Sequence, residues 1–198
     1  MFIDFFSETP QEYQDRLVRH IVKRGYTVYG GYVYKRLVNG DRTDDIDVHV
    51  KDNEDMKSLA KNLEETFGCV EEQKYLETRY WDIDPFVTGL KMKCPCRDFP
   101  KSSCTVDLMQ PYMSQNNDIF KLEYMQVNDK PHIVYKNGTK EQANKVIRKL
   151  QKRQFTSWSD MREKDKEYFD KKYFSRKMWL DTNSWNYRIK KSIKWISE

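Results

Sequence analysis

The chain has 198 residues, of which 38% are hydrophobic, 14% aromatic and 34% charged, so it can form one hydrophobic core and a small appendage but not a large multidomain protein. Its formal net charge is +5, but the charges are unevenly distributed along the chain. Residues 138–198 contain 17 basic and 8 acidic side chains, whereas residues 1–137 contain 19 basic and 23 acidic ones. No segment approaches the ~20 consecutive apolar residues that span a bilayer, and the N-terminus lacks the basic start and long apolar core of a signal peptide.

Turn residues and hydrophobic spacing divide the chain into helices and strands. Helices are predicted where apolar residues recur every three or four positions after a capping residue, as they do after Thr9-Pro10. Strands are predicted where β-prone or strictly alternating residues lie between turns. In chain order we expect a helix from Pro10 to about Gly25, a strand at 26–29, a short helix at 32–37, a strand at 45–50, a helix at 53–67, strands at 69–72, in the 80–92 region, at 104–109 and at 130–135, and a helix at 140–154.

This order predicts an α+β protein with a mixed β-sheet flanked by helices over residues 1–137, followed by a basic, aromatic-rich helical extension over residues 138–198. Two interpretations of the extension stay open. Its lysines and aromatic rings would bind single-stranded nucleic acid by neutralising phosphates and stacking on bases. Alternatively, the aromatic residues pack the extension onto the rest of the protein while the lysines face solvent.

The chain holds four cysteines: Cys69, Cys94, Cys96 and Cys104. Four are too few for a disulfide scaffold in a chain of this length, which is typical of a reducing compartment. Zinc binding through thiolates is a possible alternative, but the usual Cys-x-x-Cys spacing is missing, so we favour free, buried thiols. We therefore expect an intracellular protein, cytoplasmic, nuclear or viral, that does not associate with a membrane.

Two aspartates share one face of the strand predicted at residues 45–50. Asp45 and Asp47 project together, roughly 7 Å apart at ~3.3 Å rise per residue. Their charges repel unless a cation lies between them, and hard divalent cations such as Mg²⁺ prefer oxygen ligands. Asp107, on a later strand, would complete a site for two Mg²⁺ ions about 3.5–4 Å apart, with Mn²⁺ as a substitute. We therefore expect Asp45, Asp47 and Asp107 to be both metal ligands and catalytic residues.

A pair of glycines adds a predicted phosphate-binding turn. Gly30-Gly31 connects a strand to a helix N-terminus, where backbone N–H groups and the helix dipole favour anions. The absent side chains would let a triphosphate approach the backbone. The 14 residues from Gly31 to Asp45 leave room for a short helix and a return loop, so the turn and the aspartates can lie at one edge of the sheet.

Residues 28–48, from Val28-Tyr29-Gly30-Gly31 to Asp45-Ile46-Asp47-Val48, resemble the signature of the DNA polymerase beta nucleotidyltransferase superfamily in the Gly-Gly form of CCA-adding enzymes and poly(A) polymerases. The resemblance covers roughly residues 26 to 109. It implies the nucleotidyltransferase fold, with the glycines holding an NTP, Asp45 and Asp47 binding two Mg²⁺ ions, and Asp107 helping to activate the acceptor hydroxyl.

The chain departs from the CCA-adding pattern in two ways. It reads Val33-Tyr34-Lys35 where those enzymes commonly have Val-Arg-Asp, so the sugar or acceptor contacts of that Arg-Asp pair do not transfer. It is also too short for their neck, body and tail. The sequence therefore resembles a minimal nucleotidyltransferase head, of the stand-alone or large-DNA-virus type.

The sequence predicts a Mg²⁺-dependent nucleotidyltransferase that transfers a nucleoside monophosphate from an NTP such as ATP to an acceptor hydroxyl, with nucleic acid as the favoured acceptor. One alternative is a catalytically inactive module of the same fold that binds RNA, DNA or a protein partner. A metal-dependent nuclease is disfavoured because it leaves Gly30-Gly31 unexplained. His49 shares the carboxylate face, and we favour a satisfied, half-buried histidine over a catalytic one.

Overall fold

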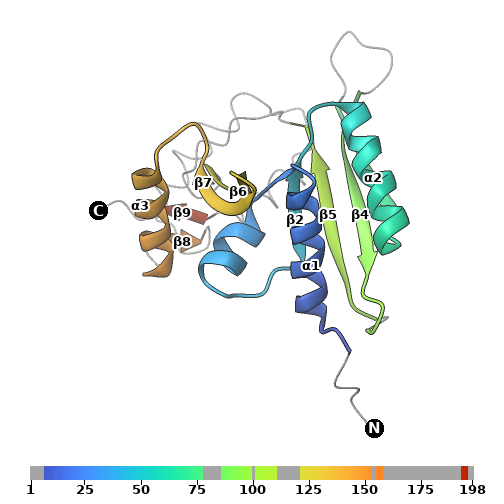
Figure 1. Ribbon diagram of the computed structural model, residues 1–198, viewed down its shortest axis with the longest axis horizontal. Helices are drawn as coiled ribbons and strands as arrows, with labels where there is room; N and C mark the ends of the chain where they lie inside the picture. The colour runs from blue at the N-terminus through green and yellow to red at the C-terminus, as the bar shows by residue number, and fades with distance from the viewer. Residues whose placement is uncertain are drawn as a thin grey trace. The chain divides into compact units, whose positions relative to one another are not determined.

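The computed structural model describes residues 7–77, 86–99, 101–110, 121–152, 155–157 and 193–195. The protein is an α+β protein whose described part contains a seven-stranded mixed sheet and four helices (Figure 1). The elements are α1 (Pro10–Lys23), β1 (Thr27–Tyr29), η1 (Tyr32–Val38), β2 (Asp45–His49), α2 (Asn53–Phe67), β3 (Val70–Glu77), β4 (Phe86–Pro95), β5 (Ser103–Met109), β6 (Leu122–Val127), β7 (Lys130–Tyr135), α3 (Lys140–Gln151), β8 (Phe155–Ser157) and β9 (Ile193–Trp195).

The seven-stranded sheet has the order β3-β4-β5-β2-β1-β6-β7. β2 and β5, at its centre, are parallel, whereas each of the other neighbouring pairs is antiparallel. Parallel neighbours need a crossover connection, and here α2, β3 and β4 supply it between β2 and β5. This crossover brings the two strands predicted to carry carboxylates side by side.

Capping residues define the two helices that the sequence predicts most clearly. At the start of α1, the Thr9 hydroxyl accepts a hydrogen bond from the Glu12 backbone N–H, and the Glu12 carboxylate accepts one from the Thr9 N–H. α2 begins after Asp52, whose carboxylate accepts from the Asp55 N–H, and ends at Gly68 with a φ of +67°. The predicted bounds of α2 are confirmed at both ends.

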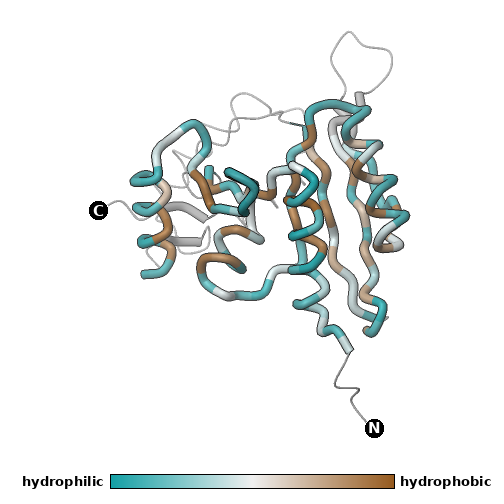
Figure 2. The backbone as a smooth tube through the Cα atoms, in the orientation of Figure 1, coloured by the Kyte–Doolittle hydropathy of each residue, from teal (hydrophilic) through white to brown (hydrophobic). Residues whose placement is uncertain are grey.

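The hydrophobic core lies between α1, α2 and one face of the sheet. Strand alternation turns Ile46 and Val48 of β2 to this face, and both are 0% exposed. α1 contacts β1 and β6, while α2 contacts β4 and β5. Figure 2 shows hydrophobic stretches along α1 and the neighbouring strands. The buried residues that complete this core include Leu17, Val18, Ile21, Leu59, Leu63, Val106 and Leu108.

Several elements differ from the sequence prediction. β3 runs over Val70–Glu77 rather than 69–72. The short helix after Gly31 is present, but it winds as a π-helix. β6 is missing from the prediction because the apolar residues Tyr124 and Met125 are adjacent, so apolar and polar residues do not alternate along the whole strand. The signal for this strand lies in the turn that follows, since Asn128 and Asp129 both have positive φ, as a two-residue hairpin turn requires.

The expectation of four free thiols is wrong for two of them. Cys69 and Cys94 form a disulfide, with their Cα atoms 4.2 Å apart. The neighbouring residues, Val70 and Lys93, are register partners, and this pairing of β3 with β4 brings the cysteines together. Cysteine usage therefore no longer supports a reducing compartment. Cys96 and Cys104 are free and buried, and burial raises the pKa of the Cys104 thiol to about 12.

The chain divides into two compact units, Met1–Ile147 and Arg148–Glu198, with the division inside α3. The boundary expected at 137/138 stays a prediction. The predicted helix is present as α3. The extension is not helical throughout, because β8 pairs with β9 in an antiparallel ladder that includes Trp195. Most of its other aromatic residues lie outside the described residues. None of the described helices combines the length and the hydrophobicity that a membrane span requires.

Candidate functional site

The three predicted carboxylates lie on one face of two central strands. Asp47 of β2 and Asp107 of β5 are register partners in the parallel pair, and Asp45 is the partner of Thr105. Paired residues on neighbouring strands project to the same side of a sheet. This side is opposite the one that carries the buried Ile46, so the helices that cover the core do not cover the aspartates.

The carboxylates of Asp45 and Asp107 each accept a hydrogen bond from a hydroxyl group. The Thr105 hydroxyl donates a hydrogen bond to Asp45 Oδ1, and the Tyr75 phenol donates one of 3.0 Å to Asp107 Oδ1. In the part of the chain that the structure describes, no group of three or more His, Cys, Asp or Glu side chains is arranged to hold a metal ion. The oxygen donors and the shared face are of the kind that Mg²⁺ prefers.

Gly30 packs against the carboxylate of Asp47. Its φ of +71° is a conformation that other residues adopt at a cost, and a Cβ atom here would overlap Asp47 Oδ2 and lie 3.2 Å from Asp47 Cγ. Both reasons require glycine at this position. The arrangement follows from the pairing of β1 with β2, in which Tyr29 is the register partner of Asp47. The glycine turn and the aspartate therefore lie together, as the sequence predicts.

Gly31 has ordinary helical dihedral angles, and a Cβ atom at this position would lie 3.3 Å from Thr43 Oγ1. Thr43 belongs to the loop before β2. The buried carboxamide of Gln14 donates a hydrogen bond of 2.6 Å to the Thr43 carbonyl oxygen, which fixes this loop to α1. The Thr43 hydroxyl donates a hydrogen bond of 3.3 Å to the Asp45 carbonyl oxygen, so the Gly31 turn, the loop and the start of β2 are held against one another.

Tyr34 adds a buried phenol to this side of the site. Burial and, to a smaller extent, the negative charge of Asp47 together raise the pKa of Tyr34 to about 12. The phenol therefore stays protonated and neutral at physiological pH. It is an oxygen-bearing group near Asp47 that the motif resemblance does not assign.

A second set of polar residues lies beside β1, on the same face as Asp47. The His49 ring stacks on Tyr29, with centroids 3.9 Å apart and planes 8° from parallel. His49 Nε2 is 3.6 Å from Glu123 Oε1, and Lys136 Nζ is 3.9 Å from the same oxygen. His49 Nδ1 is buried and has no hydrogen-bond partner among the described residues. The histidine is therefore half-buried, as expected, but the hydrogen-bonding capacity of its Nδ1 atom is not satisfied by the described residues.

Sequence reasoning missed Glu123 because it missed β6. This carboxylate is 8% exposed and is the register partner of Tyr29, which in turn pairs with Asp47. It also missed Lys91 and Lys93 of β4, which are the register partners of Asp107 and Thr105. Because these pairings need the strand order, only the alternation of Lys91 and Lys93 around an apolar residue could have suggested that they share a face.

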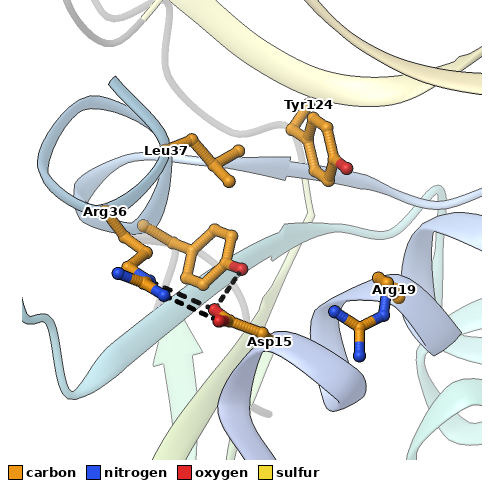
Figure 3. A pocket seen from close by; sticks show the side chains of 6 residues that line it. Asp15, Arg19, Arg36, Leu37 and Tyr124 are labelled. Carbon is orange, nitrogen blue, oxygen red and sulfur yellow. Dashed lines mark hydrogen bonds and ion pairs between the residues drawn. The ribbon is translucent and has the colours of Figure 1, made fainter. Parts of the chain in front are cut away.

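A separate hollow of about 320 Å³ lies between α1, η1 and β6 (Figure 3). Arg36 and Tyr32 both donate hydrogen bonds to Asp15 in its wall. Burial raises the pKa of Asp15, but hydrogen bonds from Arg36 and Tyr32 outweigh it and hold the pKa below its ordinary value. The register partner of Tyr124 is Val28, a core residue, so the hollow lies on the opposite face from the aspartates and is not part of the candidate site. Its lining residues are Asp15, Arg19, Tyr32, Arg36, Leu37 and Tyr124.

Comparison with known proteins gives no family for the chain. No protein-family model and no curated protein sequence matches it. The functional argument therefore depends on the glycine and aspartate motif and on the geometry that brings Gly30, Asp47 and Asp107 together.

Proposed function

We propose that the protein is a nucleotidyltransferase, and that its sheet and helices form a minimal nucleotidyltransferase fold. It would transfer a nucleoside monophosphate from an NTP, such as ATP, to an acceptor hydroxyl and release pyrophosphate. One observation supports this proposal more than any other. Gly30, in a conformation that favours glycine, packs against Asp47, and Asp107 is the register partner of Asp47 on the adjacent parallel strand.

Each predicted site residue has a role in this reaction. The Gly30-Gly31 backbone would position the β- and γ-phosphates, while Asp45 and Asp47 would hold two Mg²⁺ ions. Asp107 would share the ion nearest the acceptor. Bound Mg²⁺ would neutralise phosphate charge and lower the pKa of the acceptor hydroxyl. The acceptor oxygen then bonds to the α-phosphorus as the bond to pyrophosphate breaks, and the hydroxyl proton leaves to solvent.

The strand order supports a nucleic-acid acceptor. Across β4-β5-β2-β1, the carboxylates lie between Gly30 on the β1 side and the lysines Lys91 and Lys93 on the β4 side. An acceptor that approaches Asp107 from the side away from the NTP therefore meets two positive charges. Lysines bind the phosphates of a nucleic-acid backbone without regard to sequence.

A specific observation favours the second candidate, a module of this fold that binds nucleic acid or a protein without catalysis. Asp45 is held by Thr105, and the described residues contain no three-donor group arranged for a metal ion. If the bond between Thr105 and Asp45 persists in solution, Asp45 does not join the other two carboxylates. A nuclease with the same aspartates leaves the contact between Gly30 and Asp47 without a role.

The deciding experiment incubates the full chain and Mg²⁺ with each labelled NTP and a mixed pool of RNA, DNA and protein acceptors. We expect one labelled product, and a loss of at least about a hundredfold in Asp47→Asn, because the isosteric amide cannot supply the charge that binds the ions. Asp44→Asn is the matched control, since it removes an exposed neighbouring carboxylate, and it should keep wild-type activity.

Calorimetry separates the remaining alternatives. An active site should bind NTP only when Mg²⁺ or Mn²⁺ is present. Nucleic-acid binding without metal and without heat from NTP identifies the inactive module, and shortening of labelled RNA identifies a nuclease. Equal incorporation by the wild type and Asp47→Asn refutes the assignment of the carboxylates.

A further inference from the structure

We infer that Tyr75 is a positioning residue for Asp107, and that Gly89 opens the path by which the Tyr75 ring reaches it. The inference rests on the proposed function, in which Asp107 acts on the acceptor side of the reaction. The phenol donates a 3.0 Å hydrogen bond to Asp107 Oδ1. A carboxylate held by a donor on a rigid element rotates less about its Cα–Cβ and Cβ–Cγ bonds, so its orientation is set before substrate arrives.

Tyr75 reaches Asp107 from two strands away. Tyr75 of β3 is the register partner of Gly89 of β4, and Gly89 is in turn the partner of Met109 of β5. The phenol therefore crosses β4 at a residue that has no side chain. A Cβ atom at position 89 would lie 2.5 Å from Met109 Sδ, 2.7 Å from the Leu108 carbonyl oxygen and 3.1 Å from Tyr75 Cδ2, all closer than ordinary van der Waals contact.

The backbone of β3 adapts at the same place. The register with β4 shifts directly after Tyr75, since Tyr75 pairs with Gly89 whereas Leu76 pairs with Val87. Such irregularities bend a strand and change the direction of a side chain. The register shift and Gly89 thus both affect the placement of Tyr75, whose phenol donates the hydrogen bond to Asp107.

A phenol suits this task better than a basic residue. Lys91 already places a positive charge next to Asp107 in the register of β4 with β5. A second cation here would compete with Mg²⁺ for the carboxylate, because it would neutralise the charge that attracts the ion. The neutral phenol of Tyr75 orients the carboxylate and leaves its negative charge in place.

The test compares Tyr75→Phe with Tyr26→Phe. Tyr26→Phe is the matched control because the Tyr26 phenol also donates a hydrogen bond to an aspartate, Asp55 Oδ1, at 2.9 Å. This bond connects the residue before β1 to α2 and lies away from the candidate site. For each full-length variant, calorimetry gives the Kd of Mn²⁺ without nucleotide, and label incorporation gives kcat and the KM for NTP. Thermal unfolding checks that both variants fold equally well.

We expect Tyr75→Phe to weaken Mn²⁺ binding about tenfold or more and to lower kcat by a similar factor, with the KM for NTP unchanged. Tyr26→Phe should change none of the three. Gly89→Ala should reproduce the effect by displacing the ring, and the double variant Tyr75→Phe/Gly89→Ala should lose no more than Gly89→Ala alone.

Each outcome decides one of the two claims. If the wild type transfers nucleotides and Tyr75→Phe matches Tyr26→Phe in kcat and Mn²⁺ affinity, the role of Tyr75 is wrong and the proposed function stands. If the wild type is inactive but Tyr75→Phe alone weakens Mn²⁺ binding, the transfer reaction is wrong and the positioning role stands. A wild type that neither reacts nor binds Mn²⁺ overturns both.

Discussion

At the scale of single residues, the candidate site depends on glycines that admit other groups. Gly30 admits the carboxylate of Asp47, and Gly89 admits the ring of Tyr75. A Cβ atom at Gly30 would overlap the Asp47 carboxylate, whereas one at Gly89 would first meet Met109 Sδ and the Leu108 carbonyl oxygen and would also crowd the Tyr75 ring. These glycines do more than permit a turn. Because they have no side chain, a polar group from a neighbouring strand can occupy the space beside them.

Gly30 and Gly40 provide a matched pair, because both have a φ of +71° but a Cβ at position 40 would meet nothing within 4 Å. We expect Gly40→Ala to lower the free energy of unfolding by about 1 kcal/mol, the cost of a left-handed conformation, and to keep activity. Gly30→Ala should lower it further and abolish NTP incorporation, because the new methyl group displaces Asp47. Urea unfolding and the incorporation assay measure both effects, and equal destabilisation would contradict the crowding at Gly30.

At the scale of elements, an ion pair joins α1 to η1. Arg36 Nη2 lies 2.8 Å from Asp15 Oδ2, and the Tyr32 phenol donates to Asp15 Oδ1 at 2.8 Å (Figure 3). η1 follows the glycine turn directly, so this pair fixes the helix that continues from Gly30-Gly31. The sequence predicts both helices from their own residues but gives no sign that they meet through Asp15.

The low pKa of Asp15 predicts how stability depends on pH. Because the folded-state pKa lies below the ordinary value of 3.8, the ionised group stabilises the fold above pH 3.8, and this stabilisation is lost as the pH falls through the folded-state pKa. We expect the difference in unfolding free energy between wild type and Asp15→Asn to be constant near pH 7 and to shrink below 3.8. Denaturant unfolding from pH 7 to 2 measures it, and a difference that stays constant to pH 2 would contradict the ion pair.

At the scale of the whole molecule, the Cys69–Cys94 disulfide links the residue before β3 to β4, on the acceptor side of the proposed site. It closes a loop between residues 25 positions apart, for which chain entropy predicts a stabilisation of about 3.5 kcal/mol. We expect a reductant to lower the melting temperature of the oxidised wild type. The Cys69→Ala/Cys94→Ala variant is the control and should melt at the same temperature with and without reductant. A wild type that melts identically in both conditions would show that the bond does not stabilise the fold.

The sequence by itself determined the features that act within a few residues. The cap at Thr9, the αL glycine at the end of α2 and the alternation of Asp45, Asp47 and His49 are local, because capping bonds and strand periodicity need only neighbouring residues. The Gly-Gly and aspartate motif is local in the same sense. These signals gave the helices, the central strand and the shared face of its two aspartates before any contact between distant segments was known.

Only the tertiary structure decided which distant residues meet at that face. The register of β2 with β5 makes Asp107 the partner of Asp47, and the order β3-β4-β5 lets Tyr75 reach Asp107. Glu123 lies on β6, a strand in which the adjacent apolar residues Tyr124 and Met125 break the alternation by which strands are recognised. Strand order and register depend on the packing of the whole sheet against α1 and α2, so no local window of the sequence contains them.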